Sequence, residues 1–412
     1  MTAKPRLLIV SSLFPPNIIG GAERSACNIG QMHLSNGHEV GVLTTAANKE
    51  QECDGKVEDG LKVWRQLMPR PYQMMDFLQA SKWKKPLWHA QDHFDPRNRS
   101  FVRKVLDQFK PDWVNVNFIQ GIGYNALQDL AEYGAPVVFH LHDLGLACIR
   151  MSMFSGGKNC EKQCSACAAS SKYKADLFKK FDRVGFSSPS QANIDTLAKF
   201  FPVKIYPNIA VLNPNKYPAP NQPSTPSKKF RIIYVGRVHE TKGVDLALEV
   251  IQKLAGLYEV EFNVIGGGPI LDEVRAKYGS QEWCHIHGFL SQQEIANFMQ
   301  DSEVMVVPSI WAENSPGVVV HANQLGLPTI GSRKGGIPEL VADGETGLLV
   351  EPGNRAAWYD ALENLIKNRE IVDRWKAELA KRAEDYGISK IYGQSIQFYE
   401  KVRDMPVRRQ HG

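Results

Sequence analysis

Short, largely apolar runs alternate along the first half of the chain with segments in which apolar residues recur every three or four positions. Residues 7–10 form a continuous apolar run, the pattern of a strand that is buried on both faces. Further runs lie at 113–116 and 137–141, and helical periodicity is found at 101–109 and 124–133. Strands that alternate with helices in this way predict a parallel sheet covered on both sides.

The pattern changes between residues 207 and 229, where six prolines lie among polar residues. Prolines at this density cannot continue a helix or a central strand, so we predict an interdomain linker here. The alternation then restarts, with strand-like runs at 231–235 and 304–307 and a helix with one apolar face at 244–257. The Ser-Gln-Gln-Glu of residues 291–294 predicts a helix start, because the serine and the glutamate can satisfy each other's backbone amides.

The length of the chain agrees with this division into domains. At about 150 residues per domain, 412 residues correspond to two or three domains. We therefore predict an α/β chain with an N-terminal domain at 1–206, a linker at 207–229, a C-terminal domain at 230–386 and a terminal helical segment at 387–412. Each domain is expected to hold a doubly wound parallel sheet, with a cleft between the domains.

Composition excludes several classes of protein. Apolar residues make up 43% of the chain and charged residues 23%, values near globular averages, which excludes disordered and fibrous chains. No apolar run approaches the roughly 18 residues of a membrane span, and the first run is too short for a signal-peptide core. A net charge of +5 is small for this length and gives no reason to expect nucleic acid as a partner.

The loops that leave the strands carry the candidate chemistry, because ligands of doubly wound sheets bind beyond the carboxyl ends of the strands. Gly20 and Gly21 precede a helix, where backbone amides can approach an anion; the alternative is a plain tight turn. Arg237 and Lys242 flank the loop after residues 231–235 and are suited to hold a diphosphate. The alternative is two solvated surface charges.

Two further loops offer an acid and a histidine. Glu313 follows the run at 304–307 and could orient a polyhydroxyl ligand or balance a developing positive charge; the alternative is a helix cap. His140 and His142 follow the run that begins at residue 137, a place for a hydrogen-bonding histidine. Because side chains alternate along a strand, we expect the two rings to face opposite ways and at least one to be structural.

Short motifs follow one another along nearly the whole chain. In the N-terminal half they are Phe14-Pro15-Pro16, Gly20-Gly21-Ala22-Glu23 and His142-Asp143. In the C-terminal half they are Val235-Gly236-Arg237, Lys242-Gly243, the segment from Pro308-Ser309 to Pro328, Gly335-Gly336-Ile337-Pro338-Glu339, Asp343-Gly344, Thr346-Gly347-Leu348-Leu349-Val350 and Pro352-Gly353. Together, and in this order, they resemble the retaining glycosyltransferases of family 4, also called the group 1 glycosyltransferases.

The resemblance implies the GT-B architecture, two Rossmann-like domains that face a central cleft, with the last helix crossing back to the N-terminal domain. It implies a nucleoside diphosphate sugar donor, with a UDP-sugar favoured, bound mainly by the C-terminal domain. The acceptor, a saccharide or a lipid-linked saccharide, would be held by the N-terminal domain. We expect a cytoplasmic enzyme of polysaccharide or glycan assembly, with peripheral contact at the inner face of the membrane as a further expectation. No cofactor is expected for catalysis, because Arg, Lys and helix dipoles neutralise the leaving diphosphate.

The resemblance also assigns roles to single residues. Arg237 and Lys242 match the pair that holds the diphosphate, and Gly20 or Gly21 matches the loop that touches it. Glu313 matches the acid that contacts the transferred sugar. His142 matches the histidine that approaches the sugar from the other domain. We therefore expect His142 and Glu313 to be the catalytic residues.

The chain departs from the family pattern at two positions. His321 stands eight positions after Glu313, where the family has a second glutamate that holds the ribose hydroxyls. A neutral histidine accepts one hydrogen bond and cannot clamp two hydroxyls, which affects donor affinity or nucleotide choice. Pro316 stands where many members have glycine and offers no amide, so the donor contact would come from Gly317 or Val318.

Two other segments suggest additional contacts. Cys148, Cys160, Cys164 and Cys167 have spacings within the range of zinc ligands and could close a structural zinc site; the alternative is unlinked thiols. Residues 82–88 combine lysines with two tryptophans and could lie on anionic lipid. We favour the other interpretation of that segment, a partly buried loop that covers the acceptor cleft.

Two alternative functions remain open from the sequence. His321 is compatible with a catalytically silent subunit that binds a nucleotide sugar, because a weakened ribose contact need not support turnover. The same fold is also compatible with a nucleotide-sugar epimerase, which needs no acceptor.

Overall fold

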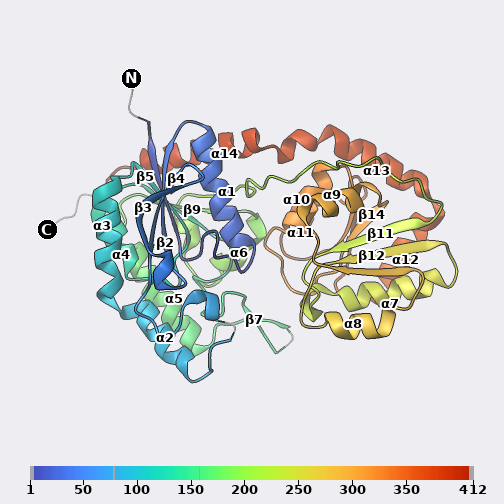
Figure 1. Ribbon diagram of the computed structural model, residues 1–412, viewed down its shortest axis with the longest axis horizontal. Coiled ribbons are helices and arrows are strands. Elements are labelled where there is room, and N and C mark those ends of the chain that lie inside the picture. Colours follow the sequence, from blue (N-terminus) through green and yellow to red (C-terminus); the bar gives the residue numbers. More distant parts are fainter. Residues whose placement is uncertain (1–3, 78, 157, 408–412) are drawn as a thin grey trace. The chain divides into compact units, whose positions relative to one another are not determined.

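The structure is a computed structural model that describes residues 4–77, 79–156 and 158–407 (Figure 1). The chain forms two compact units. The first contains the described residues of Met1–Met153, Cys160–Asn215 and Ile391–Gly412, and the second contains those of Phe154–Asn159 and Lys216–Lys390. Each unit is built on its own sheet, which confirms the predicted α/β class with two sheet-bearing parts.

The sheet of the first unit has eight strands in the order β10-β9-β6-β5-β1-β2-β4-β3. Its strands are β1 (Arg6–Ser11), β2 (Glu39–Thr45), β3 (Cys53–Glu58), β4 (Leu61–Gln66), β5 (Trp113–Phe118), β6 (Val137–His140), β9 (Val184–Ser188) and β10 (Asn208–Ala210). Neighbouring strands are parallel as predicted, except that β3 pairs antiparallel with β4 at the edge. The polar β3 has no apolar run, so the sequence pattern did not predict it.

The buried strand β1 shows why a continuous apolar run is needed. Leu7 and Ile9 pack on one face with residues of α1 and α14, whereas Leu8 and Val10 pack on the other face with residues of α3, α4, α5 and α6. Successive strand residues point to opposite faces, so both sets must be apolar when helices cover both sides. The helices of this unit are α1 (Gly21–Ser35), α2 (Lys84–Phe94), α3 (Arg99–Phe109), α4 (Ala126–Tyr133), α5 (Ser165–Phe178), α6 (Gln191–Ala198) and α14 (Ile388–Arg403).

The sheet of the second unit is wholly parallel, in the order β13-β12-β11-β14-β15-β16. Its strands are β11 (Phe230–Val235), β12 (Val260–Ile265), β13 (Cys284–Gly288), β14 (Val304–Val307), β15 (Thr329–Ser332) and β16 (Gly347–Val350). Its helices are α7 (Val244–Ala255), α8 (Leu271–Tyr278), α9 (Gln292–Gln300), α10 (Gly317–Gln324), α11 (Ile337–Leu340), α12 (Arg355–Lys367) and α13 (Arg369–Lys381). Figure 1 shows α7 and α8 on one face of this sheet and α9 and α10 on the other. The predicted capping box opens α9, where Ser291 Oγ accepts from the Glu294 amide and the Glu294 carboxylate accepts from the Ser291 amide.

The predicted linker at 207–229 is partly wrong. Its first residues form β10, which joins the first sheet beside β9, and the first unit extends to Asn215. Pro207 is compatible with this because it precedes the strand, and its carbonyl accepts from the Phe186 amide at 2.9 Å. In the expected terminal segment 387–412 the structure has α14, and residues from Ile391 onward belong to the first unit, while residues 408–412 lie outside the described residues.

The interpretation of the segment 82–88 as a loop is wrong, because its residues 84–88 form the start of α2. Pro86 falls in the first helical turn, where the missing amide costs no intrahelical bond. Trp88 is 0% exposed and its Nε1 donates to the Tyr72 carbonyl at 3.1 Å, whereas Trp83 is 75% exposed. No helix in the described part of the chain has the length and apolar character needed to cross a membrane.

Removing the Phe398 ring from α14 is expected to destabilise the first unit by about 3 kcal/mol, because the ring fills buried space beside a glycine. A Cβ added at Gly185 in β9 would lie 2.9 Å from the Phe398 ring. Urea denaturation of Phe398→Ala measures the loss. Val407→Ala is the control, since Val407 is 57% exposed, and equal stability of the two variants would contradict the packing role of α14.

Candidate functional site

In the second unit the candidate residues lie where the strand order reverses. β11 and β14 are neighbours in the sheet although β12 and β13 separate them in sequence. This is the switch point of a Rossmann-like sheet, and the loops beyond the two strand ends diverge there to leave room for a ligand. Arg237 and Lys242 follow β11, and Glu313 follows β14.

Gly243 brings these two loops into contact. It has a φ of +68°, and a Cβ at this position would lie 2.0 Å from the Pro308 carbonyl oxygen. Only glycine accepts both the left-handed backbone and this close approach. The amide of Ile310 then donates to the Thr241 carbonyl at 3.0 Å, which ties the loop after β14 to the loop after β11.

The contact places Lys242 beside Glu313, as the sequence predicted for two residues of one site. Lys242 Nζ lies 2.6 Å from Glu313 Oε1. Ser309 Oγ and Trp311 Nε1 donate to the same oxygen at 2.7 and 2.8 Å. Lys242 Nζ also lies 5.0 Å from the centre of the Trp311 ring. Glu313 is only 8% exposed, so the site holds a buried carboxylate whose direction is fixed by three donors.

Ser309, Trp311 and the glycines around Glu313 are site residues to which we assigned no role from the sequence. Gly335 has a φ of +60°, and a Cβ there would lie 2.2 Å from the Glu313 carbonyl oxygen. The next residue, Gly336, donates its amide to that same oxygen at 2.8 Å. The Gly335-Gly336 motif therefore fixes the backbone of Glu313. The two glycines belong to the motifs on which the family resemblance rests, and this was the signal that could have identified their role.

The remaining candidates of this unit differ in exposure. The Arg237 side chain is exposed. The backbone carbonyl of Arg237 accepts a hydrogen bond from Tyr234 OH at 2.8 Å. Gly317 begins α10 and, like Val318, is half-buried. His321 lies deeper in α10, 1% exposed. Its ring stacks on Tyr217 with centres 4.4 Å apart and planes 9° apart, and burial lowers its pKa, so it is neutral at neutral pH.

In the first unit, Gly20 and Gly21 stand at the exposed N-terminus of α1. Gly20 is the N-cap, and its amide donates to Glu23 Oε2 at 2.9 Å. This bond explains the glutamate of the Gly-Gly-Ala-Glu motif, because it satisfies one of the free amides of the helix start.

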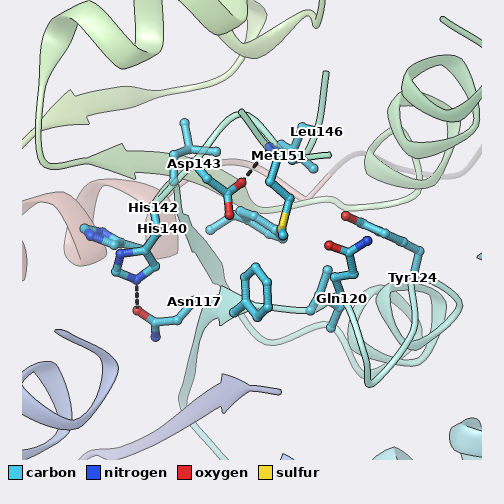
Figure 2. Close-up of a pocket in the computed structure, with 13 residues that line it drawn as sticks. Asn117, Gln120, Tyr124, His140, His142, Asp143, Leu146 and Met151 are labelled. Carbon is cyan, nitrogen blue, oxygen red and sulfur yellow. Dashed lines mark hydrogen bonds between the residues drawn. The ribbon is translucent and has the colours of Figure 1, made fainter. Parts of the chain in front are cut away.

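A small pocket opens at the carboxyl ends of β5 and β6 in the same unit. Figure 2 shows the polar ends of Asp143, Gln120 and Tyr124 directed toward one space. His142 lines the pocket, and its Nε2 lies 2.9 Å from Asn117 Oδ1. Gln120 is 4% exposed, and its Oε1 is buried without a hydrogen-bond donor among the described residues. The pocket therefore presents acceptor groups that a hydroxyl-bearing ligand can satisfy.

The prediction that His140 and His142 face opposite ways is wrong. Their rings lie 4.5 Å apart, and both line the pocket. The reason is that β6 ends at His140, so the alternation of a strand no longer applies to His142. His140 hydrogen-bonds Ser187 Oγ at 2.7 Å and Asn213 Oδ1 at 2.8 Å, and burial lowers its pKa to about 4. It is thus a neutral structural residue.

A buried lysine lies behind the pocket and was missed by the sequence analysis. Lys174 of α5 is 1% exposed, and its Nζ donates to the Gly145 carbonyl at 2.6 Å and lies 4.2 Å from the centre of the Tyr124 ring. Burial lowers the pKa of Lys174 to about 8. Asp143 accepts from the Gly145 amide at 2.5 Å, and burial raises its pKa to about 6. Helical periodicity alone gives no sign that a lysine is buried.

Replacing Asp143 with asparagine is expected to change how stability depends on pH. Because the pKa of Asp143 is raised to about 6 in the folded chain, the native state holds this proton more tightly than the unfolded chain does. The carboxyl therefore lowers stability progressively as pH rises from its ordinary range near 4 to about 6, and the loss changes little at higher pH. Melting temperatures of Asp143→Asn and wild type, measured from acid to neutral pH, should diverge in favour of the variant as pH rises. Asp107→Asn, at an exposed aspartate, should follow wild type, and parallel curves for Asp143→Asn would contradict the assignment.

The four clustered cysteines do not fit a closed zinc site as they are placed. Cys148 and Cys167 are buried, Cys160 is half-buried and Cys164 is exposed. Within residues 4–77, 79–156 and 158–407, no group of three or more His, Cys, Asp or Glu side chains is placed to hold a metal ion. A structural zinc site needs four converging ligands. Zinc at this position stays an untested prediction.

Comparisons with known proteins agree with this geometry. The profile of the group 1 glycosyl transferases matches residues 217–383, and that of glycosyltransferase family 4 matches residues 19–184. An amylovoran biosynthesis glycosyltransferase from Erwinia amylovora is 27% identical over 42% of this chain and 45% of its own length. The chain spans 35% and 45% of the length of two other curated relatives.

Solved structures share the fold over nearly the whole chain. Sucrose-phosphate synthase from Thermosynechococcus elongatus is 16% identical with a TM-score of 0.72, covering 97% of this chain and 99% of that one. Anabaena HepE in complex with UDP is 17% identical with a TM-score of 0.66, covering 96% and 100%. These likenesses show the GT-B fold. The two family profiles together match most of the chain and show that it belongs to the group 1 glycosyltransferases of family 4.

Proposed function

We propose that this glycosyltransferase moves a sugar from a nucleoside diphosphate sugar to a saccharide or lipid-linked saccharide acceptor, with retention of anomeric configuration, in glycan assembly. The observation that carries the proposal is the Lys242–Glu313 pair at the switch point of the second sheet, with a 2.6 Å contact. A cation and an oriented carboxylate side by side suit a ligand that joins a diphosphate to a polyhydroxyl group.

Each candidate residue has a role in this reaction. Arg237, Lys242 and the N-terminus of α10 at Gly317 and Val318 offset the charge of the departing diphosphate, the largest electrostatic task of the transfer. Glu313 orients the donor sugar. The bond between the sugar and the diphosphate breaks as the acceptor hydroxyl forms the new glycosidic bond on the same face. The hydroxyl proton passes to the departing phosphate, so no dedicated base is required.

The pocket of the first unit supports the acceptor side of the proposal. Asp143, Gln120 and Tyr124 direct carboxylate, amide and hydroxyl groups toward one space, and His142 also lines this pocket. Apolar lining residues such as Phe118 and Met151 complement these groups, and sugar rings have both polar edges and apolar faces. We assign His142 to contact with the donor sugar and the pocket beside it to the acceptor.

The nucleotide is proposed to be UDP. HepE, which shares the fold, was solved with UDP and with UDP-glucose, and this supports a nucleotide sugar donor here. His321 is stacked on Tyr217 and its Nε2 lies 3.3 Å from the Pro218 carbonyl. Because position 321 carries no carboxylate, the ribose hydroxyls would be bound by other groups. We expect this difference to weaken the affinity for the donor.

A ligand screen followed by product analysis tests the proposal. UDP, GDP, ADP and their sugars are added to the purified chain, and a ligand that binds the native state raises the melting temperature. The matching donor should release nucleoside diphosphate, and proton NMR of the product should show the donor's anomeric configuration. An isomerised donor formed without acceptor would replace the proposal with an epimerase. Donor binding without turnover under all acceptor conditions would indicate a silent binding subunit.

A further inference from the structure

The helix α2, on the outside of the first unit in Figure 1, turns apolar side chains toward solvent. Trp83, Leu87 and Phe94 are 75%, 54% and 62% exposed. Pro86 and Ala90, which lie between them in sequence, are exposed as well. Trp83 is the N-cap and has helical φ and ψ, so at about 100° per residue the five positions fall within an arc of roughly 100°. We call these five residues the apolar face of α2.

The opposite side of α2 fixes the helix to the first unit. There Trp88 is buried, and Asp92, also buried, accepts from the Gly121 amide at 2.7 Å through Oδ1. His93 Nε2 lies 2.7 Å from Ser170 Oγ of α5. A helix at a protein surface in water normally turns its polar residues outward, whereas α2 buries an aspartate and a histidine and exposes its apolar residues. Because the buried contacts set the rotation of α2, the apolar face is held toward solvent.

The charges beside the apolar face are positive. Lys82 lies two residues before α2 and is exposed, and Lys84 and Lys85 lie in its first turn. Lys84 Nζ lies 5.3 Å from the centre of the Trp83 ring. The only acidic residue between positions 79 and 94 is the buried Asp92. Lysines beside exposed tryptophan, leucine and phenylalanine are typical of a helix that lies in the interface of an anionic membrane.

We propose that the apolar face of α2, with its three lysines, docks the chain on the surface of an anionic lipid bilayer. Trp83, Leu87 and Phe94 enter the boundary between headgroups and acyl chains, and the lysine ammonium groups contact lipid phosphates. A second copy of the chain fits this surface less well, because a two-fold contact would bring the same lysines of two copies together. The docking does not rest on the proposed sugar transfer and needs no donor.

Co-sedimentation of the full chain with lipid vesicles tests the proposal. At low salt the chain should bind vesicles of equal parts phosphatidylcholine and phosphatidylglycerol, and should bind pure phosphatidylcholine much more weakly. Trp83→Ala should weaken binding to the anionic vesicles about tenfold, because the variant no longer transfers an indole ring out of water. Lys84→Gln should weaken binding about fivefold, and added salt should weaken the binding of wild type.

Two matched controls come from the same unit outside α2. Ile205 is 72% exposed and Lys199 is exposed, so Ile205→Ala removes an exposed apolar side chain and Lys199→Gln removes an exposed charge. Both controls should bind the anionic vesicles as wild type does. All four variants should melt close to wild type, since each changes a side chain at the surface.

The proposal is overturned if wild type does not bind the anionic vesicles, or if Trp83→Ala binds them as well as wild type does. It is also overturned if wild type forms a stable dimer without lipid and Trp83→Ala converts it to a monomer, because the apolar face would then join two copies. Sedimentation velocity of both chains without vesicles measures this.

Discussion

Replacing Glu313 with glutamine is expected to lower sugar transfer by about 100- to 1,000-fold, the size seen when one preorganised electrostatic contact is removed from an active site. Glutamine has nearly the same shape, and its amide oxygen can still accept from Ser309 and Trp311. The loops should therefore keep their positions. What the variant loses is the negative charge beside Lys242 and, in the proposed reaction, the carboxylate that orients the donor sugar.

Release of nucleoside diphosphate from the matching donor measures this loss. Glu282→Gln is the matched control, because Glu282 is an exposed glutamate of the same unit outside the site. The control should retain wild-type turnover, and both variants should melt close to wild type. Full turnover in Glu313→Gln, with the fold intact, would remove Glu313 from the catalytic machinery and leave the pair with Lys242 as a structural contact.

Replacing Gly335 with alanine is the second change with a large expected effect. The new Cβ would lie 2.2 Å from the Glu313 carbonyl oxygen and 2.7 Å from the Glu313 nitrogen, with φ at +60°. Neither atom can move without shifting the residue that carries the buried acid. We expect a loss of about 3 kcal/mol of stability, the cost of overpacking a rigid backbone contact, together with near-complete loss of transfer.

Gly344→Ala separates the cost of the left-handed backbone from the cost of the steric contact with Glu313. Gly344 also has a positive φ, +80°, but no heavy atom lies within 4 Å of an added Cβ. This control should cost only about 1 kcal/mol, for the left-handed backbone, and should keep its activity. Urea denaturation gives the stabilities and donor turnover the activities. Equal behaviour of the two variants would mean that Gly335 does not position Glu313.

Much of the fold could be predicted because buried parallel strands leave a strong pattern. The run that became β1 is apolar at every position, since Leu7 and Leu8 face different helical layers. Elements without that pattern were missed or misassigned. The polar edge strand β3 alternates weakly, β10 follows a proline inside an apparent linker, and α2 carries a proline in its first turn.

The candidate site divides in the same way. Lys242 and Glu313 could be predicted because each follows a strand that the pattern identifies, and β11 and β14 are neighbours in the sheet. The roles of Ser309 and Trp311 as donors to Glu313 could not be predicted. The close contacts of Gly243 and Gly335 could not be predicted either. All of these contacts depend on how loops pack against each other and leave no periodic pattern in the sequence. Lys174 could not be found either, since only the fold shows that its ammonium group is buried against Gly145 and Tyr124.

Calorimetric titration of UDP into wild type and Arg237→Gln tests the central claim most directly. The claim is that the loop after β11 binds a nucleoside diphosphate. Arg237 is the appropriate probe because its side chain is exposed, so its loss should not disturb the Lys242–Glu313 pair. Removing one charge-assisted contact should weaken binding about tenfold or more, whereas Arg374→Gln, at an exposed arginine of α13, should bind as wild type. Equal affinity of Arg237→Gln and wild type, or no binding of UDP, GDP or ADP by wild type, would contradict the account.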